Sequence, residues 1–396
     1  MRVGIITYHF PYNSGAALQC LALQTVLQNL GNDVSIINYR PWYHQNRYTP
    51  HKKIIFSMQD FYEKNTNLKP IKRMTKSVHF GYKTLYFNLF QSKEFKICDK
   101  KFSGFIKSYL NETCVYRTWE QLKSAPPKCD AIISGSDQLW NTTLTNGEFD
   151  PSYFLTFVPE NCRKATYAIG ANFLDNPSTL MKVGRLLNGL EMISLREEKF
   201  LRSIKRVCGE NTQLYQHIDP TLLLKQCDYE KFESSQIQFS QSPYILTYTM
   251  GDKSQGRVYS AAKKLREETG LSIIDITGNP LRKDTVFGVD SIKTGPDEFL
   301  SYIKNARYVI TNSFHGTAFS IIYHKQFVVV PHSKTGNRVT DLLERVGLSS
   351  RWSENVDTCI ETLKNSIDYT YVEDKIDSLK QESLKYLSLV CCSNKN

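Results

Sequence analysis

Residues 3–38 read VGIITYHFPYNSGAALQCLALQTVLQNLGNDVSIIN, and this stretch decides the fold. Val3 to Thr7 is a short β-branched run that predicts a buried strand. The segment Ala16 to Leu30 repeats apolar residues at helical spacing and ends at Gly31, a typical helix stop. Val34 to Asn38 then returns as a second β-branched run. Strand, helix and strand in this order predict a βαβ unit with parallel strands.

The same alternation of strands and helices continues along most of the chain. We therefore expect an α/β protein with two Rossmann-like domains that face a cleft. The turn signal Asp219-Pro220 and a polar run that ends at Pro243 mark the boundary between the two series. The further predicted strands are 131–134, 164–168, 192–195, 244–248, 272–276, 308–311 and 327–330. The predicted parts are an N-terminal domain over 1–225, a C-terminal domain over 240–350, and helices over 355–396 that can cross back to the first domain.

Length and composition exclude several classes of protein. The chain has 396 residues, of which 41% are hydrophobic and 22% charged, so it is neither disordered nor collagen-like. It has no apolar run of about 18 residues and starts directly with a strand, so we expect neither a membrane span nor a signal peptide. Ten cysteines are scattered without a C-x-x-C pair, which is typical of thiols in a reducing compartment and predicts no metal site. The expected location is the cytoplasm.

The net charge is concentrated in one segment. Residues 43–109 contain 14 Lys or Arg and four Asp or Glu, which accounts for ten of the eleven net positive charges. Because the segment is also rich in Phe and Tyr, we interpret residues 43–110 as a basic, aromatic, helical insertion. Two interpretations stay open: the insertion contacts an anionic membrane surface, as a peripheral protein on the inner face would, or its rings pack inward and its lysines are only solvated. No nucleic-acid-binding motif occurs, so we expect no nucleic acid partner.

Ligands of open α/β sheets bind beyond the carboxyl ends of the strands, so the residues that follow each strand are the candidate site. The first such loop holds Asn13, Ser14 and Gly15 before a helix, where free N–H groups can bind phosphate or carboxylate. An ordinary helix cap explains the same residues. The second loop holds two hydroxyls and a carboxylate that can contact a sugar, or else form a simple Asx turn. Its candidate residues are Ser134, Ser136, Asp137 and Gln138.

Two later strand ends carry a cation and an imidazole. Arg196 follows the apolar run 192–195 and can present a planar fork to a carboxylate or phosphate, or pair with Glu197 or Glu198. His315 lies between a predicted strand and a predicted helix, next to Asn312 and Ser313. A neutral imidazole there can exchange a proton near neutral pH, although a histidine satisfied by main-chain groups would look the same.

Six ordered blocks together resemble the polysaccharide pyruvyl transferase family, outside the basic insertion and the C-terminal tail. The blocks are NSGAALQCLALQTVLQNLG (13–31), ISGSDQLWN (133–141), ISLREEKF (193–200), DPTLLL (219–224), TNSFHGTAFSI (311–321) and NRVTDLLERVGL (337–348). The resemblance implies a fold similar to the two-domain glycosyltransferase B type. It also implies an enzyme that uses phosphoenolpyruvate to place a pyruvate ketal on a sugar diol of a surface polysaccharide or its lipid-linked precursor, with release of phosphate. A nucleotide-sugar-dependent glycosyltransferase, or a silent binding subunit, remains the alternative.

The resemblance also implies roles for single residues. Arg196 matches the arginine thought to hold the donor, and His315 matches the histidine of the catalytic loop. Several relatives carry an arginine two positions before that histidine, where this chain has Ser313, so we expect Arg338 to replace the missing cation. We expect Asp137 to position or deprotonate the acceptor. The remaining expected contacts are Asn13, Ser14, Gly15 and Ser313 for the donor, and Ser134, Ser136, Gln138 and Asn312 for the acceptor, with phosphoenolpyruvate as substrate and no metal or other cofactor.

Overall fold

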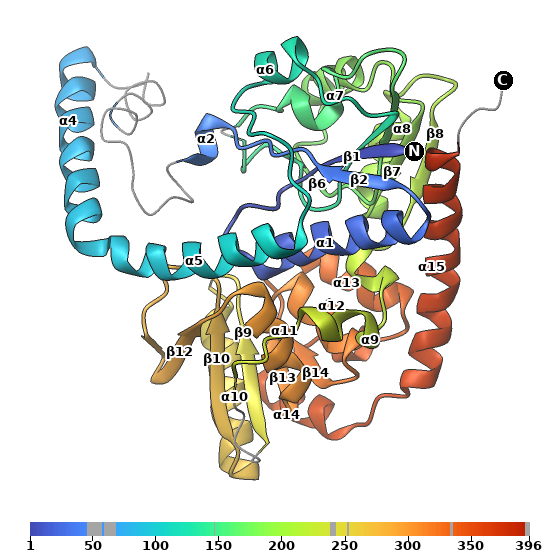
Figure 1. The fold of residues 1–396 in the computed structure, drawn as a ribbon. Coiled ribbons are helices and arrows are strands. Elements are labelled where there is room, and N and C mark those ends of the chain that lie inside the picture. The colour runs from blue at the N-terminus through green and yellow to red at the C-terminus, as the bar shows by residue number, and fades with distance from the viewer. Residues whose placement is uncertain are drawn as a thin grey trace.

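The computed structural model describes residues 1–45, 58, 69–145, 147–237, 243–251, 253–332 and 336–392. Two six-stranded sheets organise the chain (Figure 1). The N-terminal sheet has the order β2-β1-β3-β5-β7-β8, and every neighbouring pair in it is parallel. Its strands are β1 (Arg2–Ile6), β2 (Asp33–Ile36), β3 (Ala131–Ser134), β5 (Arg163–Thr166), β7 (Met192–Leu195) and β8 (Gln213–Gln216).

The C-terminal sheet has the order β11-β12-β10-β9-β13-β14. All its pairs are parallel except the β11–β12 hairpin, which lies at one edge. Its strands are β9 (Tyr244–Tyr248), β10 (Ser272–Thr277), β11 (Thr285–Val286), β12 (Val289–Lys293), β13 (Tyr308–Thr311) and β14 (Gln326–Val329). Two parallel sheets with helical crossovers confirm the predicted α/β fold class with two Rossmann-like domains.

The hairpin β11–β12 is a feature that the sequence analysis does not predict. Its two-residue turn, Phe287 and Gly288, has φ angles of 50° and 74°, which suit the right-handed twist of the two strands. Phe is an unusual residue at a positive φ, so the usual Asn-Gly or Asp-Gly signal is missing from the sequence.

Helix α1 (Ser14–Asn29) lies at the centre of the molecule. It begins at Ser14 and not at the predicted Ala16, because the Asn13 side chain accepts a hydrogen bond from the Gly15 N–H at 3.0 Å and caps the helix. Every residue from Ser14 to Leu27 is buried, which is the pattern of a helix covered on all sides. The N-terminal sheet covers one face of α1, and elements of the C-terminal domain cover another.

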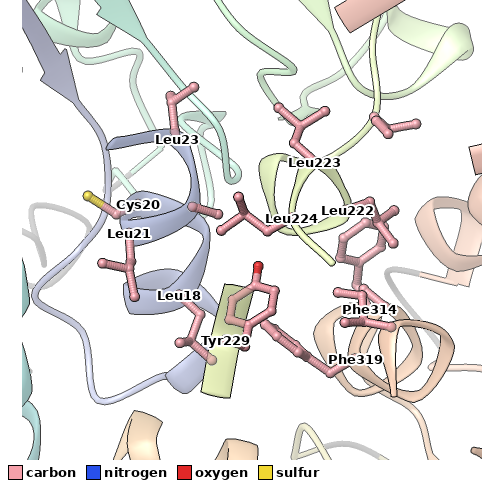
Figure 2. Close-up of a cluster of buried hydrophobic side chains, with 14 of the residues drawn as sticks. Leu18, Cys20, Leu21, Leu23, Leu222, Leu223, Leu224, Tyr229, Phe314 and Phe319 are labelled. Atoms are coloured by element: carbon pink, nitrogen blue, oxygen red, sulfur yellow. The ribbon is translucent and has the colours of Figure 1, made fainter. Parts of the chain in front are cut away.

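One apolar cluster joins the two domains. Figure 2 shows residues of α1 facing the short helices η3 (Pro220–Leu223) and α9 (Gln226–Tyr229), with residues of α12 (Phe314–Ile322) on the far side. All of them belong to a single buried core that contains strands of both sheets. This core holds the amino ends of α1 and α12 in a defined relation to each other. The labelled members are Leu18, Cys20, Leu21, Leu23, Leu222, Leu223, Leu224, Tyr229, Phe314 and Phe319.

The described part of the basic insertion consists of two long helices. Helix α4 (Pro70–Tyr86) projects from the body of the protein (Figure 1). A π-helical turn, η1 (Phe87–Gln91), connects it to α5 (Ser92–Tyr109), and α5 lies along the body. Phe95, Phe102 and Phe105 of α5 are buried, so part of the aromatic content packs inward. Residues 46–57 and 59–68 of the insertion lie outside the described residues.

The last helix, α15 (Tyr369–Cys391), runs beside the N-terminal domain. The Tyr386 hydroxyl donates a hydrogen bond to the Thr166 carbonyl of β5 at 2.6 Å, and the Arg163 guanidinium donates to the Leu389 and Val390 carbonyls. None of the helices that the structure describes is long and apolar enough to cross a membrane. The remaining helices and strands are α2 (Trp42–Gln45), α6 (Trp119–Ser124), β4 (Trp140–Asn141), η2 (Pro151–Phe154), β6 (Ala171–Asn172), α7 (Pro177–Leu186), α8 (Glu198–Lys205), η4 (Glu230–Phe232), α10 (Gln255–Thr269), α11 (Pro296–Asn305), α13 (Gly336–Arg345), η5 (Ser349–Arg351) and α14 (Val356–Lys364).

Candidate active site

A cavity of about 440 Å³ lies between the two domains. Its walls come from the loops after β1 and β3 of the N-terminal sheet and after β9, β10, β13 and β14 of the C-terminal sheet. This is the position that the carboxyl-end rule predicts for a ligand. The wall residues used below are Tyr12, Asn13, Phe95, Asp137, Gln138, Asn312, Ser313, Phe314, His315, His332 and Arg338.

The amino ends of α1 and α12 meet at Gly15 and His315. A Cβ atom at Gly15 would lie 2.7 Å from the His315 Cβ and closer still to the imidazole Nδ1. Only a glycine therefore leaves room for this ring. His315 is itself a wall residue of the cavity and is almost fully buried, so the contact fixes an imidazole from one domain on the helix of the other.

Asp219 is the centre of a buried polar network behind this wall. Its Oδ2 accepts hydrogen bonds from Arg196 Nη1 at 2.7 Å and from the Ser136 hydroxyl at 3.1 Å, and lies 3.8 Å from His315 Nε2. Its Oδ1 accepts from the Thr221 N–H and hydroxyl. Burial alone would raise the pKa of Asp219, but the charges of His315 and Arg196 and the bonds from Thr221 lower it. Asp219 therefore stays ionised and links the two cationic candidates.

Arg196 lies one layer behind the cavity wall. It is 3% exposed, and its Nε donates to Glu197 at 3.2 Å. The guanidinium carbon lies 4.5 Å from the centre of the Phe314 ring, which is part of the wall. The buried Nη2 has no hydrogen-bond partner among the described residues. Arg196 thus supports the wall through Asp219 and Phe314, and its predicted direct contact with the donor stays a prediction.

His315 and Arg338 are two basic groups of the cavity wall whose pKa values lie below their usual ones. Burial lowers the pKa of His315 despite the opposing charges of Asp219 and Asp137. Burial and the like charge of Arg196 lower the pKa of Arg338 to about 10. His315 Nε2 and Arg338 Nε have no hydrogen-bond partner within the described ranges. An anion in the cavity would raise the pKa of both groups, because a negative charge favours their protonated forms.

The predicted donor residues at the helix ends fall into two groups. Asn13 and Ser313 line the cavity, and their side chains cap α1 and α12 by accepting from the Gly15 and Gly316 N–H groups at 3.0 and 3.3 Å. Ser14 is buried and does not line the cavity. Each helix therefore starts at the cavity wall with its positive end toward the space inside.

The predicted acceptor residues are only partly gathered at the cavity. Asp137 and Gln138 line it. Ser134 and Ser136 do not, because their hydroxyls point into the N-terminal domain and donate to the carbonyls of Tyr153 and Ala168.

Asn312 lies on the cavity wall, but its amide is engaged with the protein. Its Oδ1 accepts from the Met250 N–H at 2.6 Å, and its Nδ2 donates to the Met250 carbonyl at 2.9 Å and to Ser254 at 2.8 Å. The prediction that Ser134 and Ser136 contact the acceptor is therefore corrected: these two side chains hold the loop that carries Asp137. The predicted contact of Asn312 with the acceptor stays a prediction, because Asn312 lines the cavity.

The sequence leaves several residues of the site open or does not indicate them. Asp219 is one: it precedes Pro220, so a turn role and a functional role both stay open, and the strand before it, β8, has the unremarkable sequence QLYQ. Gly170 is another: a Cβ atom there would lie 2.8 Å from Arg196 Nη2. His332 lines the cavity, although nothing in its sequence neighbourhood distinguishes it. Tyr12 and Phe95 also line the cavity, and Phe95 brings the basic insertion to it, because Phe95 belongs to α5.

Comparisons with known proteins place this site in a family context. The model of a family described as polysaccharide pyruvyl transferase matches residues 13–334. No curated protein matches the sequence. Among solved structures, the chain is similar to a UDP-GlcNAc 2-epimerase from Methanocaldococcus jannaschii, with 12% identity, 93% of each chain covered and a TM-score of 0.47. It is also similar to the UDP-GlcNAc 2-epimerase from Neisseria meningitidis, with 11% identity, 98% of this chain and 100% of the other covered and a TM-score of 0.49. The glycosyltransferase SsfS6 from Streptomyces sp. SF2575 is similar at 12% identity, with 98% of each chain covered and a TM-score of 0.42.

Proposed function

The chain belongs to the polysaccharide pyruvyl transferase family, and on that basis we propose that it transfers the pyruvyl group of phosphoenolpyruvate to a sugar diol. The product is a pyruvate ketal on a surface polysaccharide or its lipid-linked precursor, and phosphate is released. All ten cysteines are free thiols, which suits a reducing compartment, so we place the reaction in the cytoplasm.

The observation that carries the proposal is the shared cavity of His315 and Arg338. The imidazole comes from the first turn of α12, which follows β13, and the guanidinium comes from α13, which follows β14. Both line the same space as Asp137 of the other domain. A proton-exchanging group, a fixed cation and a carboxylate are what the proposed reaction needs. The cavity volume of about 440 Å³ is within the range of small-molecule sites.

The donor carries a carboxylate and a phosphate, so its site needs positive potential. Arg338 supplies a cation in the wall, and α1 and α12, which begin next to Asn13 and Ser313, turn the positive ends of their helix dipoles toward the cavity. Arg196 adds its charge from behind the wall and holds Phe314 in place. In this arrangement Arg338 takes over the part that an arginine at position 313 plays in several relatives.

The reaction then proceeds by proton transfer and substitution at the enol carbon. Protonated His315 donates a proton to the methylene carbon of the donor, which leaves positive charge on the carbon that bears the phosphate. A sugar hydroxyl bonds to that carbon and gives its proton to Asp137. The bond between this carbon and the phosphate oxygen breaks, and phosphate leaves with the electron pair. The second hydroxyl then closes the ketal and gives its proton to the departing phosphate, and Asp137 releases its proton to water. General acid-base help of this kind contributes about 10² to 10⁴-fold per group.

The lowered pKa of His315 has a role in this scheme. The free enzyme holds the imidazole mainly neutral at neutral pH, because burial disfavours the charged form. A bound dianion raises the pKa again, so the proton arrives together with the donor. His315 therefore becomes a proton donor only when the phosphoenolpyruvate that it protonates is bound.

The experiment that tests the proposal follows the products. The purified chain is incubated with candidate glycans or glycolipids and either phosphoenolpyruvate or nucleotide sugars, and products are identified by phosphorus NMR and mass spectrometry. We expect inorganic phosphate and the mass gain of a ketal, both lost in His315→Ala. Release of a nucleoside diphosphate would support the alternative, a glycosyltransferase. Product formation at the normal rate by His315→Ala would remove the assigned acid.

A further inference from the structure

Helix α4 carries an exposed apolar stripe. Its five members are spaced by three or four residues, so they lie on one face of the helix, and each is 40–80% exposed. Most are aliphatic and one is a tyrosine. The members are Ile71, Met74, Val78, Tyr82 and Leu85.

The opposite side of α4 is basic. Lys72, Lys76 and Lys83 are exposed and spaced by four and seven residues, which places them together on a face away from the stripe. A second row of exposed lysines continues on α5 at spacings of three, four and seven. Its members are Lys93, Lys96, Lys100 and Lys107.

The third side of α4 shows how the helix is held. Its buried residues are small, Ser77, Gly81 and Thr84, and the Ser77 hydroxyl donates to the Met58 carbonyl at 2.6 Å. The apolar stripe is therefore not the side that α4 packs against the chain. Figure 1 shows α4 projecting from the body beyond the end of α5.

We propose that α4 docks the enzyme on an anionic lipid bilayer, with the apolar stripe in the headgroup and acyl boundary and the lysines against lipid phosphates. A helix with an aliphatic face and a lysine-rich polar face lies in the plane of such a surface, and each lysine near the surface adds to the attraction. The three exposed lysines that α4 carries beside its apolar stripe are charge-complementary to a bilayer that contains anionic lipid.

Two other occupants fit the surface less well. A second copy of the chain could cover the stripe, but it would leave the lysines of both copies uncompensated. A single-stranded nucleic acid needs aromatic rings for its bases to stack on, and this stripe has one ring among five side chains. Binding of a second copy is an outcome that the test below separates from lipid binding.

Docking through α4 has a consequence for the active site. Helix α5 is tied to the C-terminal domain by the ion pair of Lys101 with Glu298 at 2.6 Å, and its Asp99 accepts a hydrogen bond from Tyr12 at 3.0 Å. Phe95 of α5 and Tyr12 both line the cavity. The helix that leads to the membrane therefore also forms part of the cavity wall. The idea that docking brings the cavity to a lipid-linked acceptor rests on the proposed function, whereas the docking itself does not.

The test is vesicle flotation of the full chain, with no sugar or donor present. Vesicles of phosphatidylcholine alone are compared with vesicles that also contain phosphatidylglycerol. We expect binding only to the anionic vesicles, weakened by added salt. The triple variant Lys72→Gln, Lys76→Gln, Lys83→Gln should bind about 100-fold more weakly, from about 5-fold for each lysine.

The stripe has a matched control on another helix. Met74 and Met181 are both exposed, at 62% and 57%, but Met181 belongs to α7 of the N-terminal domain. Met74→Glu combined with Val78→Glu should lower binding at least about tenfold, because two apolar side chains can no longer be buried. Met181→Glu should bind like the unchanged protein. Thermal melting of all variants shows that each is folded.

Three results would overturn the proposal. One is equal binding to neutral and anionic vesicles, and another is undiminished binding by the folded α4 variants. The third is a dimer in sedimentation analysis that Met74→Glu dissociates, without any vesicle binding, since this would make the stripe a contact between copies. Vesicle flotation does not require the enzymatic reaction. A failure of the pyruvyl transfer assay therefore does not affect the docking proposal, and a failure to bind vesicles does not affect the proposed pyruvyl transfer.

Discussion

The imidazole of His315 lies directly against Gly15, at the point where α1 of the N-terminal domain and α12 of the C-terminal domain begin. The two residues are 300 positions apart in the chain, and the apolar core shared by α1, η3 and α12 holds them together. The His315 imidazole is thus positioned by a domain to which it does not belong. Any change that moves α1 against α12 also moves this ring.

Substitution of Gly15 tests this contact. Gly15→Ala forces the ring of His315 away from its place, because the new Cβ overlaps it. We expect kcat for phosphate release to fall about 100-fold, the loss typical of a small misplacement of a reacting group. Gly104→Ala on α5 is the control, since nothing lies within 4 Å of a Cβ atom there. Equal kcat values for the two variants would show that the ring is not held by Gly15.

Arg338 should act mainly on the donor. Arg338→Ala removes the guanidinium in the cavity wall, so the KM for phosphoenolpyruvate should rise about 10 to 150-fold, the range for a hydrogen bond to a charged group. Arg202→Ala provides a control at an exposed arginine of α8, where we expect no change in KM. If the KM for the acceptor rises more than the KM for the donor, Arg338 binds the acceptor and its assignment to the donor is wrong.

Donor binding should be accompanied by proton uptake. The pKa of His315 lies below its usual value of 6.5 in the free protein, and the dianionic donor raises it, so binding near neutral pH takes up as much as about one proton. Calorimetry in buffers with different ionisation enthalpies measures this number. In His315→Gln the uptake should disappear while binding persists. The same uptake in both proteins would place the proton elsewhere.

Asp219 should be essential for the stability of the site. Asp219→Asn leaves the buried Arg196 with one acidic partner, and we expect a loss of about 3–5 kcal/mol in the free energy of unfolding. The control is Asp130→Asn, which breaks an exposed pair with Arg2 and should cost at most about 1 kcal/mol. Denaturant titration compares the two, and similar losses would contradict the buried network described above.

Acid should destabilise the fold through His217. This residue is buried against Tyr386 and Tyr167, and burial with the nearby charge of Arg345 lowers its pKa to about 4. The unfolded chain binds a proton near pH 6.5 and the folded chain does not, so stability falls as pH decreases from 6.5 to 4, by about 3 kcal/mol. His217→Gln should flatten this part of the stability curve.

The sequence predicts the fold well where its patterns are strong. The βαβ unit of residues 3–38 and the apolar strands of both sheets are found close to their predicted places, because buried parallel strands need continuous β-branched runs. Strand β8 and the β11–β12 hairpin were not predicted, since QLYQ lacks such a run and Phe287 is no usual turn residue.

The candidate site was predicted at the level of loops and less well at the level of side chains. Strand ends locate Asp137, Arg196 and His315, but they do not show which side chains point inward. Ser134 lies in a strand that is buried along its whole length, so its hydroxyl is used by the Tyr153 carbonyl. Arg196 is held behind the cavity wall by its hydrogen bond to Asp219. The two side chains meet because the neighbouring strands β7 and β8 end side by side.

The most direct test of the central claim is a structure of the protein with phosphoenolpyruvate bound. We expect the donor in the cavity between the domains, with its phosphate or carboxylate on the Arg338 guanidinium and its methylene carbon next to the His315 ring. A donor bound outside this cavity, or bound in it with Arg338 and His315 turned away, would rule out the proposed site.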